Sequence, residues 1–212
     1  PKHGAIYQPE RLDMAQETSS HPTACLALAD GTVFYGHGFG ATGQRTAELC
    51  FNTAMTGYQE IMTDPSYAGQ IVTFTFPHIG NVGTNPFDAE SQHIHASALI
   101  LKALPMTPHS NWRATLPLVD YLKDKGIVAL TGIDTRALTH VLRDKGAQRG
   151  VILETHPDAF DREHAVALAQ KLPSLVGADL AQVVSTPRTY HWTDGLWQPP
   201  GTNRPKDPAL SG

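Results

Sequence analysis

The hydrophobic pattern of the chain changes character near residue 115. Residues 23–100 hold short runs of β-branched and aromatic residues between glycine, proline, asparagine and aspartate, which is typical of strands joined by turns. Residues 115–172 alternate helix-period segments with short apolar runs. A β-rich half followed by α/β alternation predicts a mixed α/β fold.

The individual elements follow from local signals. The strongest strand signal is QIVTFTF at residues 70–76, and Asp30-Gly31 is a hairpin turn pair. Gly126 and Gly146 close two helical segments, and Asp134 is an N-cap candidate. The predicted strands are residues 23–29, 32–35, 47–54, 70–76, 95–101, 127–133 and 150–154, and the predicted helices are residues 116–125, 136–145 and 161–171.

The two ends differ from this central domain, residues 23–192. Residues 1–22 are polar and mixed, and we expect an N-terminal arm. Residues 193–212 are rich in proline and glycine, which is typical of a linker. Linkers join two domains, so the sequence predicts a further domain beyond this one.

Charge and hydropathy exclude several classes of protein. Sixteen lysines and arginines stand against 20 aspartates and glutamates, so the net charge of −4 gives no electrostatic case for binding nucleic acid or an anionic membrane. No apolar run approaches the roughly 18 residues of a membrane span, and the N-terminus lacks the apolar core of a signal peptide. We therefore expect a soluble, cytoplasmic protein.

The two cysteines are too few for a disulfide scaffold or a cysteine-rich zinc site. Cys25 and Cys50 are flanked by apolar residues and are predicted to be small core residues. Neither has the glycine-rich, helix-starting surroundings that lower a thiol pKa, so neither is a candidate nucleophile.

A glycine-rich motif at Gly38–Gly43, GFGATG, fits the dinucleotide-binding spacing GxGxxG. That function needs a helix directly after the motif, because helix N–H groups hold the pyrophosphate. The residues that follow suit a strand better. A glycine-rich link between strands is therefore the favoured interpretation, and a dinucleotide-binding oxidoreductase domain is the alternative.

Two other groups of residues give weaker evidence for a functional site. Asp64, Ser66 and His78 supply the residue types of a hydrolase triad, but Ser66 lacks the GxSxG elbow. Asp-Pro-Ser-Tyr at residues 64–67 is an ordinary turn sequence, in which the aspartate accepts backbone N–H bonds and the proline fixes φ. His93 and His95 would share one face of a strand and could begin a metal site, with Glu90 or His78 as the nearest options for a third ligand, but the histidines lack recognisable metal-binding spacing. We expect no bound metal in this chain.

The segment at residues 52–67, NTAMTGYQEIMTDPSY, concentrates hydroxyl, amide and carboxylate side chains. Such a loop-rich segment suits recognition of a small polar molecule, and a self-bonded cluster of turns is an equal alternative.

Long motifs in the chain resemble the N-terminal domain of the small (glutaminase) subunit of glutamine-dependent carbamoyl-phosphate synthetase. The resemblance covers about residues 23–197. It is carried by FNTAMTGYQEIMTDPSYAGQIV at residues 51–72, FPHIGNVGTN at 76–85, SNWR at 110–113, GIDTRALTHVLRDKGAQRGVI at 132–152 and YHWTDG at 190–195. For the fold, it implies a swivelling domain of the β/β/α type.

The resemblance also implies that different domains and subunits carry out different steps of the reaction. In that family a following class I amidotransferase domain carries a Cys–His–Glu triad that releases ammonia from L-glutamine. The ammonia passes through a tunnel to the large subunit, which makes carbamoyl phosphate with bicarbonate and ATP and would hold the ATP and Mg²⁺. The product serves arginine and pyrimidine biosynthesis. This chain would then contain no catalytic residue and no cofactor, and its partners would be the amidotransferase domain and the large subunit.

One residue in the chain takes a site role by this resemblance. Ser66 of DPSY is expected to bind the substrate glutamine across the domain boundary, with Tyr67 and Gln59 as weaker candidates for the rim of that site. The uncharged loop at residues 78–85, HIGNVGTN, is expected to form a wall of the ammonia path or part of the subunit interface.

Overall fold

A closed seven-stranded barrel forms the centre of the computed structural model, which describes residues 21–105, 109, 111–154, 159–175 and 177–192. The predicted linker, residues 193–212, and residues 1–20 of the predicted arm lie outside the described residues. The strands follow one another around the barrel in the order β1-β2-β6-β5-β4-β3-β7. They are β1 (Ala24–Leu28), β2 (Val33–Gly40), β3 (Gln44–Asn52), β4 (Gln70–Phe74), β5 (Ala98–Ile100), β6 (Val128–Thr131) and β7 (Gln148–Glu154).

The barrel has a parallel side and an antiparallel side. β3, β4, β5 and β6 run parallel to one another. β7, β1 and β2 pair antiparallel with each other and with the two ends of the parallel set, which closes the ring. The helices are α1 (Tyr58–Thr63), α2 (Leu118–Asp124), α3 (Thr135–Lys145), α4 (Arg162–Lys171) and α5 (Leu180–Val184), with a short 3-10 helix η1 (Pro65–Tyr67).

Apolar side chains fill the barrel, as expected where alternate residues of each strand point inward. The interior contains Leu26, Leu28, Leu49, Ile71, Ile100, Leu130 and Ile152, each essentially inaccessible to solvent. Leu138 and Leu142 of α3 join the same cluster, so the apolar face of that helix extends the interior.

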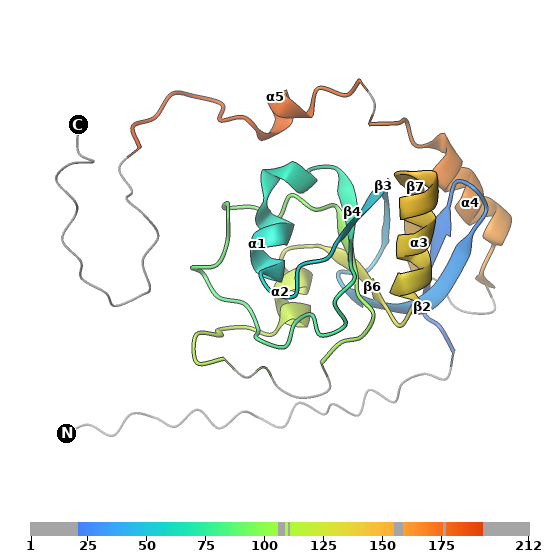
Figure 1. Cartoon of the computed structure of the whole chain (residues 1–212), viewed down its shortest axis with the longest axis horizontal. Coiled ribbons are helices and arrows are strands. Elements are labelled where there is room, and N and C mark those ends of the chain that lie inside the picture. The colour runs from blue at the N-terminus through green and yellow to red at the C-terminus, as the bar shows by residue number, and fades with distance from the viewer. Residues whose placement is uncertain (1–20, 106–108, 110, 155–158, 176, 193–212) are drawn as a thin grey trace.

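Two further clusters cover the outside of the barrel. Tyr58 and Met62 of α1 and Leu122 of α2 pack with outward-facing residues of the parallel strands, such as Val72. On the antiparallel side, Ala165 of α4 belongs to the cluster that covers β1 and β7. Figure 1 shows α1 and α2 on one side of the barrel and α3 and α4 on the other.

The glycine motif links β2 to β3, which are not neighbours in the barrel. Gly38 lies in β2, and a Cβ there would fall 2.8 Å from the Glu154 carboxylate. That carboxylate also accepts a hydrogen bond from the Gly43 N–H at 2.9 Å. A strand begins at Gln44 where the dinucleotide hypothesis requires a helix, so that hypothesis is wrong.

The structure confirms the mixed α/β class and every predicted strand and helix, with shifted ends. β2 continues through the glycines to Gly40, and β5 is shorter than predicted. His93 and His95 therefore precede β5 instead of sharing a strand face, which corrects that expectation.

Helix α1 was not predicted. It is too short for a periodic signal, and burial of Tyr58 and Met62 stabilises it.

Candidate functional site

The predicted site residues lie in the connection between the parallel strands β3 and β4, which contains α1 and η1 (Figure 1). Ser66 is the middle residue of η1 and is exposed to solvent. Tyr67 is half-buried, whereas Gln59 on α1 is only 4% exposed. The three residues therefore face different environments, although they are close in sequence.

The local sequence explains the turn that carries Ser66. Asp64 is the N-cap of η1, and its side chain accepts a hydrogen bond from the Ser66 N–H at 2.8 Å. Pro65 occupies the first position, where its fixed φ suits the turn and its missing N–H costs nothing. Ser66 is thus exposed on a turn that the chain closes with its own groups.

Thr63 anchors the segment before the turn. Its buried hydroxyl donates to the Gln59 carbonyl at 2.8 Å and accepts from the Glu90 N–H at 2.9 Å. The Ser91 hydroxyl donates to the Thr63 carbonyl at 2.7 Å. The end of α1 is thus fixed to the loop that precedes β5.

Tyr67 anchors the segment after Ser66. Its ring packs against the cluster under α1 and α2, and its hydroxyl accepts a hydrogen bond from Asn52 Nδ2 at 2.8 Å. Asn52 is the last residue of β3. The turn is therefore attached to the barrel by a side-chain bond as well as by the backbone.

Gln59, the other rim candidate, is buried and bonded to the backbone of Asn85. Its amide nitrogen donates to the Asn85 carbonyl at 2.5 Å, and its amide oxygen accepts from the Asn85 N–H at 3.0 Å. A buried side chain with both functions engaged stabilises the loop that contains Asn85. Contact of Gln59 with a ligand stays a prediction.

The HIGNVGTN loop, which contains Asn85, also has polar contacts with α1 and with Asp88, and Asp88 in turn contacts the loop around Arg113. The Tyr58 hydroxyl donates to the Gly83 carbonyl, and Asn85 Nδ2 donates to Asp88 at 2.8 Å. Asp88 also forms an ion pair with Arg113, in which both side chains are about one-fifth exposed. These bonds hold the HIGNVGTN loop and the residues around Arg113 beside α1.

Titratable groups near α1 reflect this packing. Burial raises the pKa of Glu60, and the Asp88 and Glu90 carboxylates raise it further, whereas Arg113 lowers it. Burial likewise raises the pKa of the Tyr58 phenol. The surroundings of α1 thus disfavour additional negative charge.

The structure does not assemble a hydrolase triad. Asp64 binds the Ser66 backbone, and the His78 ring lies edge-on to Phe76 with 5.7 Å between ring centroids. Within the described part of the chain, no hydrogen bond joins the Ser66 hydroxyl to a histidine. The described residues also contain no cluster of three or more histidine, cysteine, aspartate or glutamate side chains that could hold a metal ion.

The cysteines behave as the sequence predicted. Cys25 is fully buried, and Cys50 is half-buried with its thiol 3.9 Å from the Ile71 carbonyl. Burial raises the pKa of each thiol to about 11, and Glu48 adds to the rise at Cys50. Both thiols therefore stay protonated and weakly nucleophilic near neutral pH.

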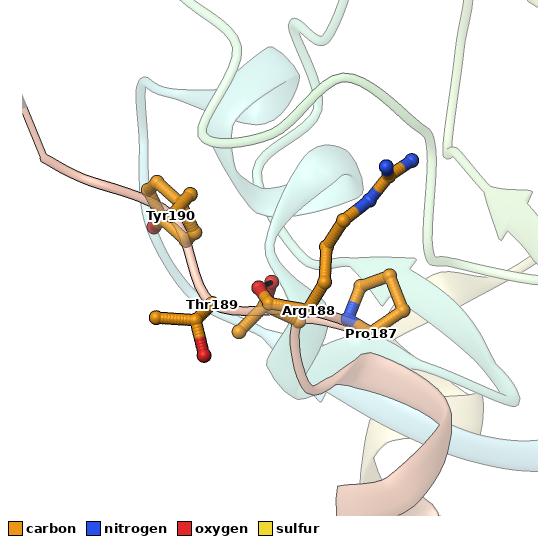
Figure 2. A pocket seen from close by; sticks show the side chains of 5 residues that line it. Pro187, Arg188, Thr189 and Tyr190 are labelled. Atoms are coloured by element: carbon orange, nitrogen blue, oxygen red, sulfur yellow. Dashed lines mark hydrogen bonds between the residues drawn. The ribbon is translucent and has the colours of Figure 1, made fainter.

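A surface hollow is lined by the segment that follows α5. Thr186, Pro187, Arg188, Thr189 and Tyr190 line it, and Figure 2 shows the Arg188 side chain extended away from its backbone. None of the predicted site residues contributes to it.

No helix within the described ranges has the length and apolar character needed to cross a membrane.

The site contains contacts that sequence analysis missed. Asn52 was one of many polar residues in its segment, Glu90 was considered only as a metal ligand, and Ser91 and Asp88 carried no signal. Each acts through a partner that is remote along the chain, and only the fold identifies that partner. The Asp64 turn, by contrast, was readable because cap and turn are neighbours in sequence.

Comparison with known proteins gives a consistent result. Residues 26–152 match the family model described as carbamoyl-phosphate synthase small chain, CPSase domain. The carbamoyl phosphate synthase small chain of Ruegeria pomeroyi is 53% identical over 196 residues, covering 92% of this chain and 50% of the relative. Those of Pseudomonas putida and Pasteurella multocida are 55% and 54% identical, each covering 82% of this chain and 46% or 44% of the relative. The chain thus spans about half the length of the curated relatives it matches.

Proposed function

Because the chain belongs to the carbamoyl-phosphate synthase small-chain family, we propose that it is the N-terminal domain of a glutamine-hydrolysing subunit. That subunit supplies ammonia from L-glutamine to a large subunit, which makes carbamoyl phosphate from ammonia, bicarbonate and ATP. The family's swivelling-domain description and its cytoplasmic location belong to the same proposal. ATP and Mg²⁺ are assigned to the large subunit.

The observation that carries the proposal is the exposed Ser66 hydroxyl on an anchored turn. A hydroxyl can donate to the α-carboxylate of glutamine or accept from its α-ammonium group. Holding the substrate from one side orients its amide carbon for attack by a nucleophile on the facing domain. Ser66 is therefore a binding residue, and Tyr67 is a secondary candidate beside it.

In this proposal the chain helps to bind glutamine, and the amidotransferase domain carries the catalytic residues. The thiols of Cys25 and Cys50 have pKa values of about 11, which does not suit a nucleophile that must ionise near neutral pH. This supports a Cys–His–Glu triad located in the amidotransferase domain. We expect this chain to be inactive alone.

The HIGNVGTN loop is proposed as a wall of the ammonia path or part of the large-subunit interface. A path for ammonia must exclude bulk water, because ammonium is not nucleophilic. The bonds from Tyr58 to Gly83 and from Gln59 to Asn85 give this loop a fixed shape.

Asn81 is a better position than Gly83 for a substitution that tests the role of this loop. A Cβ at Gly83 would fall 2.8 Å from the Ala114 Cβ, so substitution there would disturb the fold, whereas Asn81 is exposed. An Asn81→Leu variant of the intact enzyme should weaken coupling between glutamine hydrolysis and carbamoyl-phosphate synthesis. Unchanged coupling would count against this role.

Ser66→Ala in the intact two-subunit enzyme tests the main proposal. Loss of a hydrogen bond to a charged group costs about 1.5–3 kcal/mol, which corresponds to a roughly 10- to 150-fold fall in kcat/KM for glutamine. Synthesis from ammonia should remain nearly intact. Ser185→Ala removes another exposed serine hydroxyl and should change neither rate. Equal losses with both nitrogen donors would indicate a folding role for Ser66 and reject the proposal.

A further inference from the structure

The geometry points to Asn52 as a positioning residue that fixes Ser66 in place through the Tyr67 hydroxyl. The inference rests on the proposed role of Ser66 in binding glutamine. Asn52 ends β3, and its amide nitrogen lies 2.8 Å from the hydroxyl of the residue that follows Ser66. The side chain therefore connects the barrel directly to the turn.

The orientation of the Asn52 amide follows from its second partner. Its oxygen accepts a hydrogen bond from the Ala54 N–H at 2.7 Å. The amide nitrogen must then face Tyr67, so Asn52 donates and the phenol oxygen accepts. Both functions of the side chain are engaged, and the amide cannot turn away without losing both bonds.

The turn needs this attachment because, apart from a backbone bridge between Ala68 and Ala96, its other bonds are local. The Ser66 N–H binds Asp64, the Tyr67 N–H donates to the Asp64 carbonyl at 3.1 Å, and the Ala68 N–H donates to the Pro65 carbonyl at 3.0 Å. These bonds set the shape of the turn but not its direction from the barrel. Among the described residues, the bond between Asn52 and Tyr67 is the one side-chain hydrogen bond from η1 to a strand.

The two anchors lie on opposite sides of Ser66. Thr63 fixes the chain before the turn through Glu90 and Ser91, and Asn52 fixes it afterwards through Tyr67. A binding hydroxyl must be held within about half an ångström of its productive place. Release of one anchor should therefore weaken glutamine binding while every group that touches the substrate remains present.

The test uses Asn52→Ala, Tyr67→Phe and the double variant in the small subunit assembled with the large subunit. Each single change removes the bond between Asn52 and Tyr67, and Asn52→Ala also removes the bond from the Ala54 N–H, so we expect a rise of about three- to tenfold in KM for glutamine. The rate from ammonia and the kcat with glutamine should change by less than about twofold. The double variant should match the larger single effect, because the bond can be lost only once.

Two further variants sharpen the result. Asn52→Asp keeps an acceptor for Ala54 and lets the Tyr67 hydroxyl donate in reverse, so its KM should lie closer to that of the wild type than that of Asn52→Ala does. Tyr35→Phe removes a phenol hydroxyl from β2, on the antiparallel side of the barrel, and it should leave KM unchanged.

The outcomes separate this inference from the proposed function. If Ser66→Ala raises KM but Asn52→Ala does not, Asn52 is not a positioning residue and the role of Ser66 stands. Additive effects in the double variant would show that Tyr67 acts independently of Asn52. A parallel loss of ammonia-dependent synthesis would show a structural role only. If Ser66→Ala itself leaves kcat/KM for glutamine unchanged, the proposed function fails.

Discussion

The antiparallel and parallel sides of the barrel are connected in different ways. On the antiparallel side, residues 29–32 are enough to join β1 to β2, and α4 covers the outer face. On the parallel side, residues 53–69, 75–97 and 101–127 join β3 to β4, β4 to β5 and β5 to β6. Every residue argued to build the candidate site belongs to the parallel side or to its connections.

The difference follows from strand direction. Antiparallel neighbours can be joined by a tight turn, whereas parallel neighbours require the chain to return along the barrel before the next strand begins. The returning segments are long, and they provide surface positions that a rigid core can hold in place. The parallel side therefore supplies the positions for chemistry, and the antiparallel side closes the barrel that supports them.

The largest effect is expected from Gly36→Val on the antiparallel side. A Cβ at Gly36 would fall 2.3 Å from the Thr131 carbonyl oxygen and 2.8 Å from Ile133 Cγ2. Because the first contact is with backbone, relief requires β2 and β6 to separate. We expect a loss of about 3 kcal/mol in the free energy of unfolding, measured by urea denaturation of this chain.

Gly126→Asn is the matched control for that change. Gly126 has φ +71° and no heavy atom within 4 Å of an added Cβ, and asparagine tolerates this conformation. Its cost should stay below about 1 kcal/mol. Similar losses in both variants would show that barrel closure is not the sensitive feature.

A smaller and more local effect is expected from Gln59→Leu on the parallel side. The change leaves the buried Asn85 N–H and carbonyl without their partner, at a cost of about 2 kcal/mol. Amide hydrogen exchange should accelerate in α1 and in residues 79–91, while β1 and β7 keep their protection. The exposed Gln92→Leu should alter neither region. Uniform acceleration would contradict the division into two sides.

The sequence predicted the elements of the fold because their signals are local. The Asp30 carboxylate accepts from the Thr32 N–H at 2.9 Å in the predicted hairpin, and Asp134 accepts from the Ala137 N–H at 2.9 Å as the predicted cap. Barrel closure was not predicted. It depends on pairing between strands far apart in sequence, such as β1 with β7, and alternation alone does not choose a partner.

The site was predictable to a similar extent. The DPSY turn was readable because Asp64 and Ser66 interact at close sequence range. The engagement of Gln59 with Asn85 was not, since an amide looks the same in sequence whether it binds substrate or backbone. The bond from Asn52 to Tyr67 joins residues on either side of α1, and α1 gave no periodic signal from which their approach could be predicted.

The smallest effect concerns pH and Glu60, which lies on the parallel side. Burial, reinforced by Asp88 and Glu90, raises the pKa of Glu60 above its ordinary 4.5, so the folded chain holds this proton more tightly than the unfolded chain does. The free energy of unfolding should therefore fall as the pH rises from 4.5 through the folded pKa. Glu60→Gln should flatten this slope and add a few tenths of a kcal/mol at pH 7, since solvent screens a partly exposed group. Glu163→Gln on α4 removes an equal charge from the antiparallel side as the control. A slope for Glu60→Gln that matches the wild type would show that the surroundings of α1 do not oppose negative charge.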